Sequence, residues 1–296
     1  MLFSSRIRCA ELARIIGVLT LVAVLGACSA IKLAYNNLPE VSYWWLDGYF
    51  DFDSTQTPKV RDELAQLLAW HRQNELPKVI TLLQDAQGLA LGEVTPAQAC
   101  GMADQIRERL LAVTEHAEPA STELLLSLGE GQLQQLERKY AKNNNEYRKD
   151  WLDRTPAQVH EKRYDQFLDR AEDFYGRLTA EQRDLLKQQV AQSVFNPQLA
   201  DAERRKRQQE ALAMLRGFIG TAKPSSAEAR AALHAYVQRI AEPPPGAWRD
   251  QQQALLLEGC RNTAALHNGT TASQREQAVR RLQAYQNDLR QLVAVR

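Results

Sequence analysis

The residues best suited to chemistry are single histidines and acidic side chains that match no complete catalytic motif. His160-Glu161-Lys162-Arg163-Tyr164 begins like the zinc-binding H-E-x-x-H helix, but Tyr164 stands where the second histidine ligand is required. The five histidines also lack a second histidine four residues away, which would bind metal on one helix face. The sequence therefore predicts no metal centre and no cofactor, and His160 is expected on a solvated helix face.

Two acidic segments come near to known chemistry. Asp51-Phe-Asp53-Ser-Thr-Gln56 begins like a calcium loop but lacks the glycine at its sixth position and the glutamate at its twelfth, which favours a turn and helix cap. Paired carboxylates such as Glu172 and Asp173 are what a cell-wall glycosidase would use, but nothing in the sequence separates them from surface charge. With no nucleophile elbow and no phosphate-binding glycine loop, we expect a protein that is not an enzyme.

Charge gives little indication of a partner. The chain has 37 Lys and Arg against 36 Asp and Glu, so no bulk positive charge points to nucleic acid. Arg204-Arg205-Lys206-Arg207 is the densest basic run, but four consecutive helical residues spread around most of the helix circumference. We expect a solvated helix there. The alternative is contact with anionic lipid or with a phosphate-bearing envelope polymer.

The N-terminus has the organisation of an export signal. Arg6, Arg8 and Arg14 precede the uncharged apolar run from Ile15 to Leu25, which is far shorter than the roughly 20 residues of a spanning helix. The run ends in Leu25-Gly26-Ala27-Cys28, which resembles the lipobox of bacterial lipoproteins. An uncleaved anchor or an ordinary signal peptide with a coincidental cysteine remains the alternative.

The lipobox resemblance implies that residues 1–27 are a lipoprotein signal peptide and that Cys28 becomes the first mature residue. Cys28 would then carry a diacylglycerol and an amide-linked acyl chain such as palmitate, anchoring the protein at about 0.8 kcal/mol per buried CH₂. Ser29 replaces the aspartate that retains lipoproteins in the inner membrane, which favours the outer membrane. The implied location is the periplasm, with the membrane as a partner.

Beyond Cys28 the pattern is helical almost throughout. Gly88, Gly176, Asn196-Pro197, Gly220, Pro243–Pro245 and Asn268-Gly269 are expected to end helices, and Thr57-Pro58 to begin one. We expect an all-α fold, an irregular multi-helix bundle of antiparallel helical hairpins, with residues 28–296 as one domain and a C-terminal hairpin after 245. Five capping boxes precede apolar-periodic stretches: Thr95/Gln98, Thr155/Gln158, Thr179/Gln182, Ser225/Glu228 and Ser273/Glu276.

Residues 35–53 form an aromatic segment close behind the lipobox. Near-helical spacing of Leu38, Val41, Trp45, Tyr49 and Phe52 predicts one buried stripe, so the segment is expected to complete the core. The alternative is a membrane-interface belt or an aromatic binding groove, because Trp and Tyr favour headgroup depth. The aromatic side chains available for such contacts are Tyr43, Trp44, Trp45, Tyr49 and Phe50.

Together with the lipobox, the stretch Tyr35-Asn-Asn-Leu followed by Trp45-x-x-x-Tyr49-x-Asp51 resembles an uncharacterised family of proteobacterial lipoproteins. The resemblance implies a helical periplasmic protein and brings no catalytic or ligand residues. Leu178-Thr-Ala-Glu-Gln182, with Val94-Thr-Pro-Ala-Gln98 as an approximate copy, also resembles a signature of Spy-type periplasmic chaperones. The same letters form ordinary capping boxes, which is the favoured interpretation.

Two cysteines remain in the mature chain, because Cys9 leaves with the signal peptide and Cys28 takes the lipid. In an oxidising periplasm, Cys100 and Cys260 are more often bridged than free, so a disulfide is expected; two buried thiols are the alternative. The function that fits best is a non-catalytic interaction or scaffold protein of the envelope, whose partner is an unidentified envelope protein or polymer. The alternatives are a cell-wall hydrolase or transglycosylase with an unrecognised carboxylate site, and a Spy-like chaperone.

Overall fold

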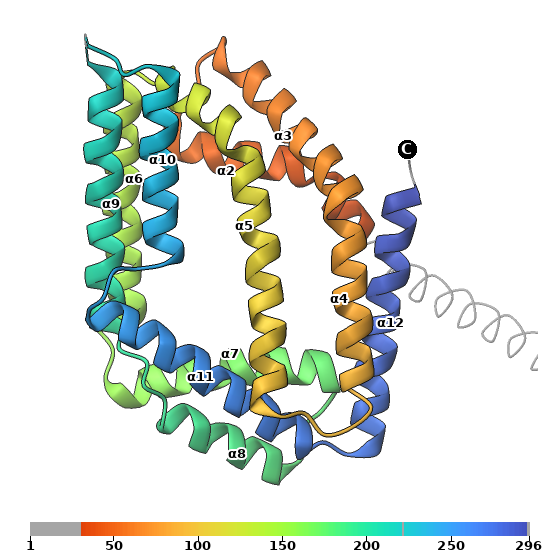
Figure 1. The fold of residues 1–296 in the computed structure, drawn as a ribbon. Helices are drawn as coiled ribbons and strands as arrows, with labels where there is room; N and C mark the ends of the chain where they lie inside the picture. The colour runs from red at the N-terminus through yellow and green to blue at the C-terminus, as the bar shows by residue number, and fades with distance from the viewer. Residues whose placement is uncertain (1–30, 221, 295–296) are drawn as a thin grey trace, which may run out of the picture.

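The computed structural model describes residues 31–220 and 222–294, which contain helices and no strand (Figure 1). The expected all-α fold is confirmed. The elements are α2 (Leu38–Phe50), α3 (Gln56–Asn74), α4 (Leu76–Leu89), α5 (Pro96–Leu126), α6 (Glu130–Tyr147), the π-helical turn η1 (Arg148–Leu152), α7 (Pro156–Tyr175), α8 (Ala180–Ala191), α9 (Pro197–Ile219), α10 (Ser226–Ala241), α11 (Ala247–Asn268) and α12 (Ala272–Ala294).

Reciprocal capping boxes begin α5, α7, α8 and α10, as the sequence predicts. The fifth predicted box, at Ser273, is wrong. Thr271 Oγ1 accepts from the Gln274 backbone N–H at 3.3 Å, and Gln274 Oε1 accepts from the Thr271 N–H at 2.9 Å. The Gln274 amide also bonds Gln182 across the helix interface, and this second contact favours the earlier start.

Two other helix boundaries differ from the prediction. Asn196-Pro197 does not end a helix but begins α9, because the Asn196 side chain accepts from the Leu199 N–H at 3.0 Å and proline fits the first helical position. Helix α3 begins at Gln56, just ahead of Thr57-Pro58. There the Asp53 carboxylate accepts from the Gln56 N–H at 2.9 Å, which is the turn and cap expected for that acidic segment.

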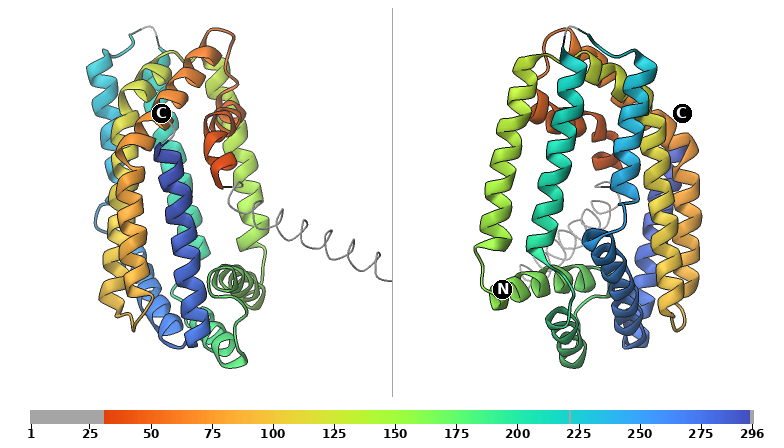
Figure 2. Two further views of the ribbon diagram at one scale, coloured as in Figure 1. Left: turned by 90° about the vertical axis from the view of Figure 1, so that its right-hand side faces the viewer. Right: turned by 60° about the vertical axis from the view of Figure 1, so that its left-hand side comes forward.

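Helix α5 runs through the middle of the molecule and packs against α3, α4, α9, α10 and α11 (Figure 1). On one side α9 packs against α6 and α10, and on the other α4 and α12 lie side by side (Figures 1 and 2). Helices α2 and α3 lie at one end, and α7, α8 and α11 at the other (Figure 1). The two helices after residue 245 diverge: α11 packs against α5 and α8, whereas α12 packs against α4 and α7.

The core is divided among four clusters of buried side chains rather than gathered in one. Three of the clusters join elements that are distant in sequence, and the last joins the consecutive helices α2 and α3, so the clusters fix the helices relative to one another. They are Leu128, Leu133, Leu136, Leu215, Phe218 and Ala229; Ala171, Leu178, Leu186 and Leu266; Tyr35, Leu76 and Leu292; and Tyr43, Phe52 and Val60.

Candidate binding surfaces

The aromatic helix α2 is buried along a different face from the one that the sequence predicts. Of the predicted stripe, Leu38, Val41 and Trp45 are exposed, whereas Tyr43 outside that stripe is only 5% exposed. The Tyr43 ring lies under the Arg61 guanidinium at 4.2 Å, and its hydroxyl is 3.1 Å from Thr57 Oγ1. Phe52 is buried, as expected, but it lies beyond Asp51, whose left-handed backbone (φ 52°) ends the helix. Helical spacing therefore cannot extend to Phe52.

The aromatic residues of α2 divide into a structural set and an exposed set. Phe50 packs beside two core clusters, and the half-buried Tyr49 accepts a hydrogen bond from Asn143 Nδ2 at 2.9 Å. Trp44 and Trp45 are 64% and 60% exposed, and Val41 lies beside them on the same open face. This exposed α2 face, comprising Leu38, Val41, Trp44 and Trp45, is an apolar surface suited to binding a membrane or a partner.

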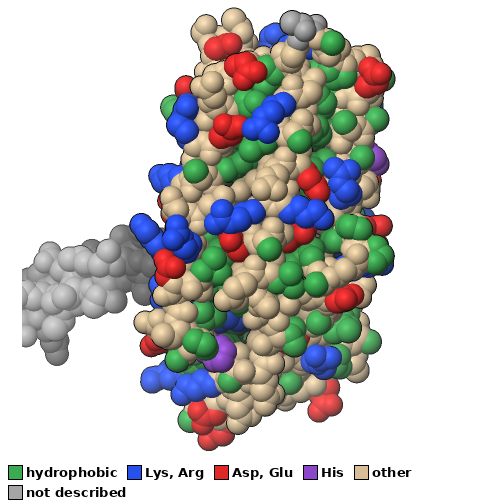
Figure 3. Space-filling view, turned by 90° about the vertical axis from the view of Figure 1, so that its left-hand side faces the viewer, with side chains coloured by type: hydrophobic (Ala, Val, Ile, Leu, Met, Phe, Trp, Pro, Cys, Tyr) green, Lys and Arg blue, Asp and Glu red, His purple; other side chains and the backbone are tan. Residues whose placement is uncertain are grey.

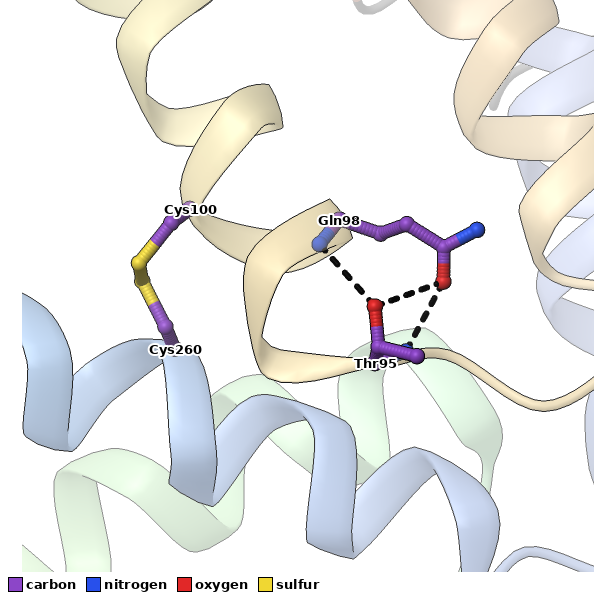
Figure 4. Close-up of a disulfide and its surroundings, with 4 residues drawn as sticks. All are labelled: Thr95, Gln98, Cys100 and Cys260. Atoms are coloured by element: carbon purple, nitrogen blue, oxygen red, sulfur yellow. Dashed lines mark hydrogen bonds between the residues drawn. A yellow bond between two sulfur atoms is a disulfide. The ribbon is translucent and has the colours of Figure 1, made fainter.

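The two cysteines of the described chain form a disulfide, the pairing that the sequence predicts. It joins Cys100 in α5 to Cys260 in α11 with the Cα atoms 5.3 Å apart (Figure 4). The Thr95–Gln98 capping box lies at the start of α5 beside it. The disulfide therefore fixes the crossing of two helices that belong to distant parts of the sequence. Cys28 and Ser29 lie outside the described residues.

An apolar pocket of about 410 Å³ lies next to this disulfide and is called the disulfide pocket below. Its walls come mainly from α4, α5 and α11 and include Met102, Ile106, Leu256 and Gly259, with Cys260 itself among the lining residues. No Asp, Glu, Lys or Arg of the described chain lines it. The pocket therefore lies within the size range of small-molecule sites and is suited to an uncharged, apolar occupant.

His267 and Tyr175 form a hydrogen-bonded polar pair in the disulfide pocket, whose other polar lining residues are the exposed Gln98 and Thr263. The Tyr175 hydroxyl is 3.0 Å from His267 Nδ1, and His267 Nε2 is 2.9 Å from the Gly92 carbonyl oxygen. Because a carbonyl only accepts, Nε2 carries the proton and Nδ1 accepts from the tyrosine. Burial of this neutral ring lowers the pKa of His267, and burial raises the pKa of Tyr175 to about 12.

A second, more polar groove of about 850 Å³ lies between α3 and α5 and reaches the start of α10. Asp62, Glu63, His116 and Arg230 are among its lining residues. Beside it, the buried Glu118 carboxylate accepts from Arg230 Nε at 2.7 Å and lies 2.8 Å from His234 Nδ1. These hydrogen bonds and charges, that of Arg230 first, lower the pKa of Glu118.

Other carboxyl groups singled out in the sequence serve caps and ion pairs. Glu172 accepts from the Leu178 N–H at 3.0 Å and from Arg183 at 2.6 Å, which lower its pKa; Asp173 pairs with Arg281 at 2.9 Å. Wherever the pKa of a carboxyl group in the described chain departs from its ordinary value, it is lowered. A glycosidase acid needs the opposite shift. His160 is exposed, and no three potential metal ligands of the described residues come together.

The basic run on α9 is solvated, as predicted, at Arg205 and Lys206, which are exposed, and half-buried at Arg204 and Arg207. Arg204 and Arg205 both bond Asp201, and Arg207 bonds Glu203 at 2.9 Å. The three arginines are thus ion-paired within the helix, because acids stand three or four residues before them. Figure 3 views the side that carries α6 and α9 and shows basic and acidic side chains interspersed there.

Two pairs of glutamine side chains meet between helix starts, a feature that the sequence analysis missed. Gln182 and Gln274 exchange amide hydrogen bonds of 2.7 and 2.9 Å, and Gln56 and Gln132 exchange bonds of 3.2 and 2.7 Å. All four side chains also accept a backbone N–H at a helix N-terminus. The available signal was a glutamine three residues after the residue that caps the helix start. In the chaperone-like Leu178–Gln182 segment this glutamine therefore acts as a cap and a tie between helices.

Comparison with known proteins yields one match. A model described as a family of unknown function (DUF6279) matches residues 48–239, which is more than half of the chain. No curated protein and no solved structure matches. Among the described residues, no helix combines the length and apolar character needed to cross a membrane.

Proposed function

Because the chain belongs to the DUF6279 family, whose description assigns no activity, we propose its role from its own surfaces. The protein is a lipid-anchored lipoprotein of the proteobacterial envelope that works by binding, without catalysis, at the periplasmic face of the outer membrane. The observation that carries the proposal is the exposed α2 face, with Trp44 and Trp45 open to solvent. It begins ten residues after the lipobox cysteine, Cys28.

The composition of the α2 region supports contact with a bilayer. Tryptophan prefers the headgroup layer, where its ring is buried and its N–H stays hydrated. Arg61 lies beside this face, 4.2 Å from the Tyr43 ring and 5.8 Å from the Trp44 ring, and pairs with Glu40 of α2 at 3.2 Å. An acyl chain on Cys28 would hold α2 close to the bilayer, so even weak contacts by α2 would orient the body of the protein.

The disulfide supports the proposed compartment. Structural disulfides form and persist in oxidising environments such as the bacterial periplasm and are rare in the cytosol of mesophiles.

Lipidation is tested by Cys28→Ala in cells supplied with labelled palmitate. The wild-type protein should incorporate label and fractionate with the outer membrane, whereas the variant should remain an unlabelled precursor of higher mass. Cys9→Ala is the matched control and should behave as wild type. A cleaved and labelled Cys28→Ala protein would contradict the anchor.

Membrane contact by α2 is tested separately with a photoreactive amino acid at position 45 of the lipidated protein in intact cells. Crosslinks to phospholipid are expected there and not at the equally exposed Leu91, which lies outside α2. Crosslinks from position 45 to one envelope protein, with none to lipid, would mean that α2 binds that protein and not the bilayer. No crosslink to either would overturn the proposed role of this face.

A further inference from the structure

We propose that the disulfide pocket binds a single aliphatic chain, that of a free fatty acid. The inference concerns α5 and α11 and does not depend on the anchor or on α2. The chemistry of the lining carries it. None of the lining residues is charged, and the largest of them are leucine, isoleucine, methionine and aromatic side chains.

The buried polar groups of the pocket are already occupied by one another. His267 is 4% exposed, and both of its ring nitrogens have partners, Tyr175 and the Gly92 carbonyl. Gln98 and Thr263 also line the pocket, but both are uncharged and exposed, so they lie on its solvent side. A ligand that placed a charge deep inside would lose hydration and gain no charged partner. A hydrocarbon chain has no hydrogen bonds to water that it could lose on entry, and the burial of its apolar surface is favourable. The charged carboxylate of the fatty acid therefore stays outside, at the mouth.

Large apolar side chains also stand at the mouth of the pocket. Ile106 on α5 is 47% exposed, and Leu256 on α11 is 43% exposed; both line the pocket. Leu110 continues this surface one helical turn further along α5, and it too is exposed. Exposed large aliphatic residues on two facing helices are costly in a soluble body unless a ligand covers them. They provide a path for the chain from solvent into the pocket.

The size and rigidity of the site favour one chain over two. A volume of about 410 Å³ lies near the lower end of the range for small-molecule pockets. The disulfide between Cys100 and Cys260 fixes the crossing of α5 and α11 at the wall of the pocket, so the pocket exists before the ligand arrives. A preformed site avoids the cost of ordering on binding. A two-chain phospholipid would leave its second chain in water.

Photolabelling tests the site with the full lipidated protein in native membranes. A palmitic acid analogue with a photoreactive group near its methyl end should label peptides that contain Met102 or Leu256, and excess unlabelled palmitic acid should suppress the labelling. A phosphatidylethanolamine with the same group on one chain should label these peptides weakly. Stronger labelling of these peptides by the phospholipid would overturn the assignment to a free fatty acid.

Gly259→Leu provides the sharpest variant. Gly259 lines the pocket, and a Cβ placed there meets no atom within 4 Å, so a leucine fills the pocket without a backbone clash. Labelling of the pocket peptides should fall about tenfold, because the chain loses several methylene contacts. Gly217→Leu is the matched control, a helical glycine on α9 with equally open surroundings and no place in the pocket, and it should label as wild type.

Leu256→Asp is a second variant, which keeps the proposal testable if Gly259→Leu does not fold. Its side chain is partly solvent-exposed, so the fold should survive, while a carboxylate at the mouth repels the fatty-acid carboxylate and interrupts the apolar path. Labelling should again fall about tenfold. Unchanged labelling of the pocket peptides in both variants, or labelling confined to α2, would overturn the proposal. Absence of lipid crosslinks from position 45 of α2 would count against the proposed function but not against this fatty-acid site.

Discussion

The buried His267 accepts a hydrogen bond from a tyrosine and must stay neutral to do so, and the half-buried His71 also lies next to a tyrosine hydroxyl. His71 Nδ1 lies 2.8 Å from the Tyr35 hydroxyl, and His267 Nδ1 lies 3.0 Å from Tyr175. Burial lowers the pKa of both histidines. A lowered pKa means that the folded protein resists a proton that the unfolded chain accepts, so folding is linked to pH near 6.5, the ordinary histidine value.

The free energy of unfolding should therefore be nearly constant above about pH 7 and should fall as the pH drops below about 6.5, levelling off once it has passed the lowered pKa values. His267→Gln should lower the stability at neutral pH and remove part of this pH dependence. Urea unfolding at pH 7.5 and 5.5 measures both effects. The exposed His160 is the control: His160→Gln should keep the full pH dependence. An equal loss in both variants would contradict the role of His267.

The buried amide pair Gln182–Gln274 should show energetic coupling. Changing either residue to leucine removes the two amide hydrogen bonds of the pair and leaves the other amide with its backbone contacts alone, to Gly269 or to Arg177, at a cost of about 1–3 kcal/mol. The double variant should cost less than the sum of the single variants, with a coupling energy of about 1 kcal/mol in a double-mutant cycle. Gln98→Leu, at an exposed capping box, should cost about 1 kcal/mol or less and should be additive with Gln274→Leu.

At the scale of single elements, sequence patterns located helices better than they located their faces. Capping boxes predicted the starts of four helices because the bonds are local. The buried face of α2 was mispredicted because two contacts of Tyr43 decide it: its ring packs under Arg61, and its hydroxyl contacts Thr57. Both partners belong to α3, so the pattern within α2 does not reveal them. The ion pairs of the α9 arginines could have been predicted, since Asp201 and Glu203 stand three or four residues before them on the helix.

Adjacent residues of α2 should differ sharply in their contribution to stability. Tyr43→Ala removes a buried ring from the cluster with Phe52 and Val60 and should cost about 3–5 kcal/mol. Trp44→Ala removes a larger but exposed ring and should change stability by no more than about 0.5 kcal/mol. Thermal or urea unfolding of the two variants compares them directly. Equal costs would mean that α2 buries its other face.

At the scale of the whole molecule, the sequence predicted the fold class and the cysteine pairing but neither the disulfide pocket nor the divergence of α11 and α12. Cysteine counting works because only two cysteines remain in the described chain. The pocket arises where α4, α5 and α11 meet, and no local pattern encodes that meeting. The apolar residues Ile106 and Leu256 were visible in the sequence, but their joint exposure depends on the helix crossing.

The disulfide should contribute strongly to global stability. It links residues 160 apart, for which the chain-entropy model gives about 5 kcal/mol. Cys100→Ser combined with Cys260→Ser should lower the free energy of unfolding by roughly that amount, and a reductant should destabilise the wild-type protein but not the double variant. Urea unfolding with and without reductant measures this. A wild-type protein insensitive to reductant under denaturing conditions would contradict the bond.

The pairing of α4 with α12 has a consequence for how the protein is made. Gln286 Nε2 bonds Gln87 Oε1 at 2.7 Å, and Leu292 is buried against Leu76 and Tyr35, so early residues are covered by the last helix of the described chain. During synthesis the apolar face of α4 therefore stays uncovered until α12, at Ala272–Ala294, has left the ribosome. A premature stop before residue 272 would leave that face open permanently, and the truncated product should be a substrate for quality-control proteases.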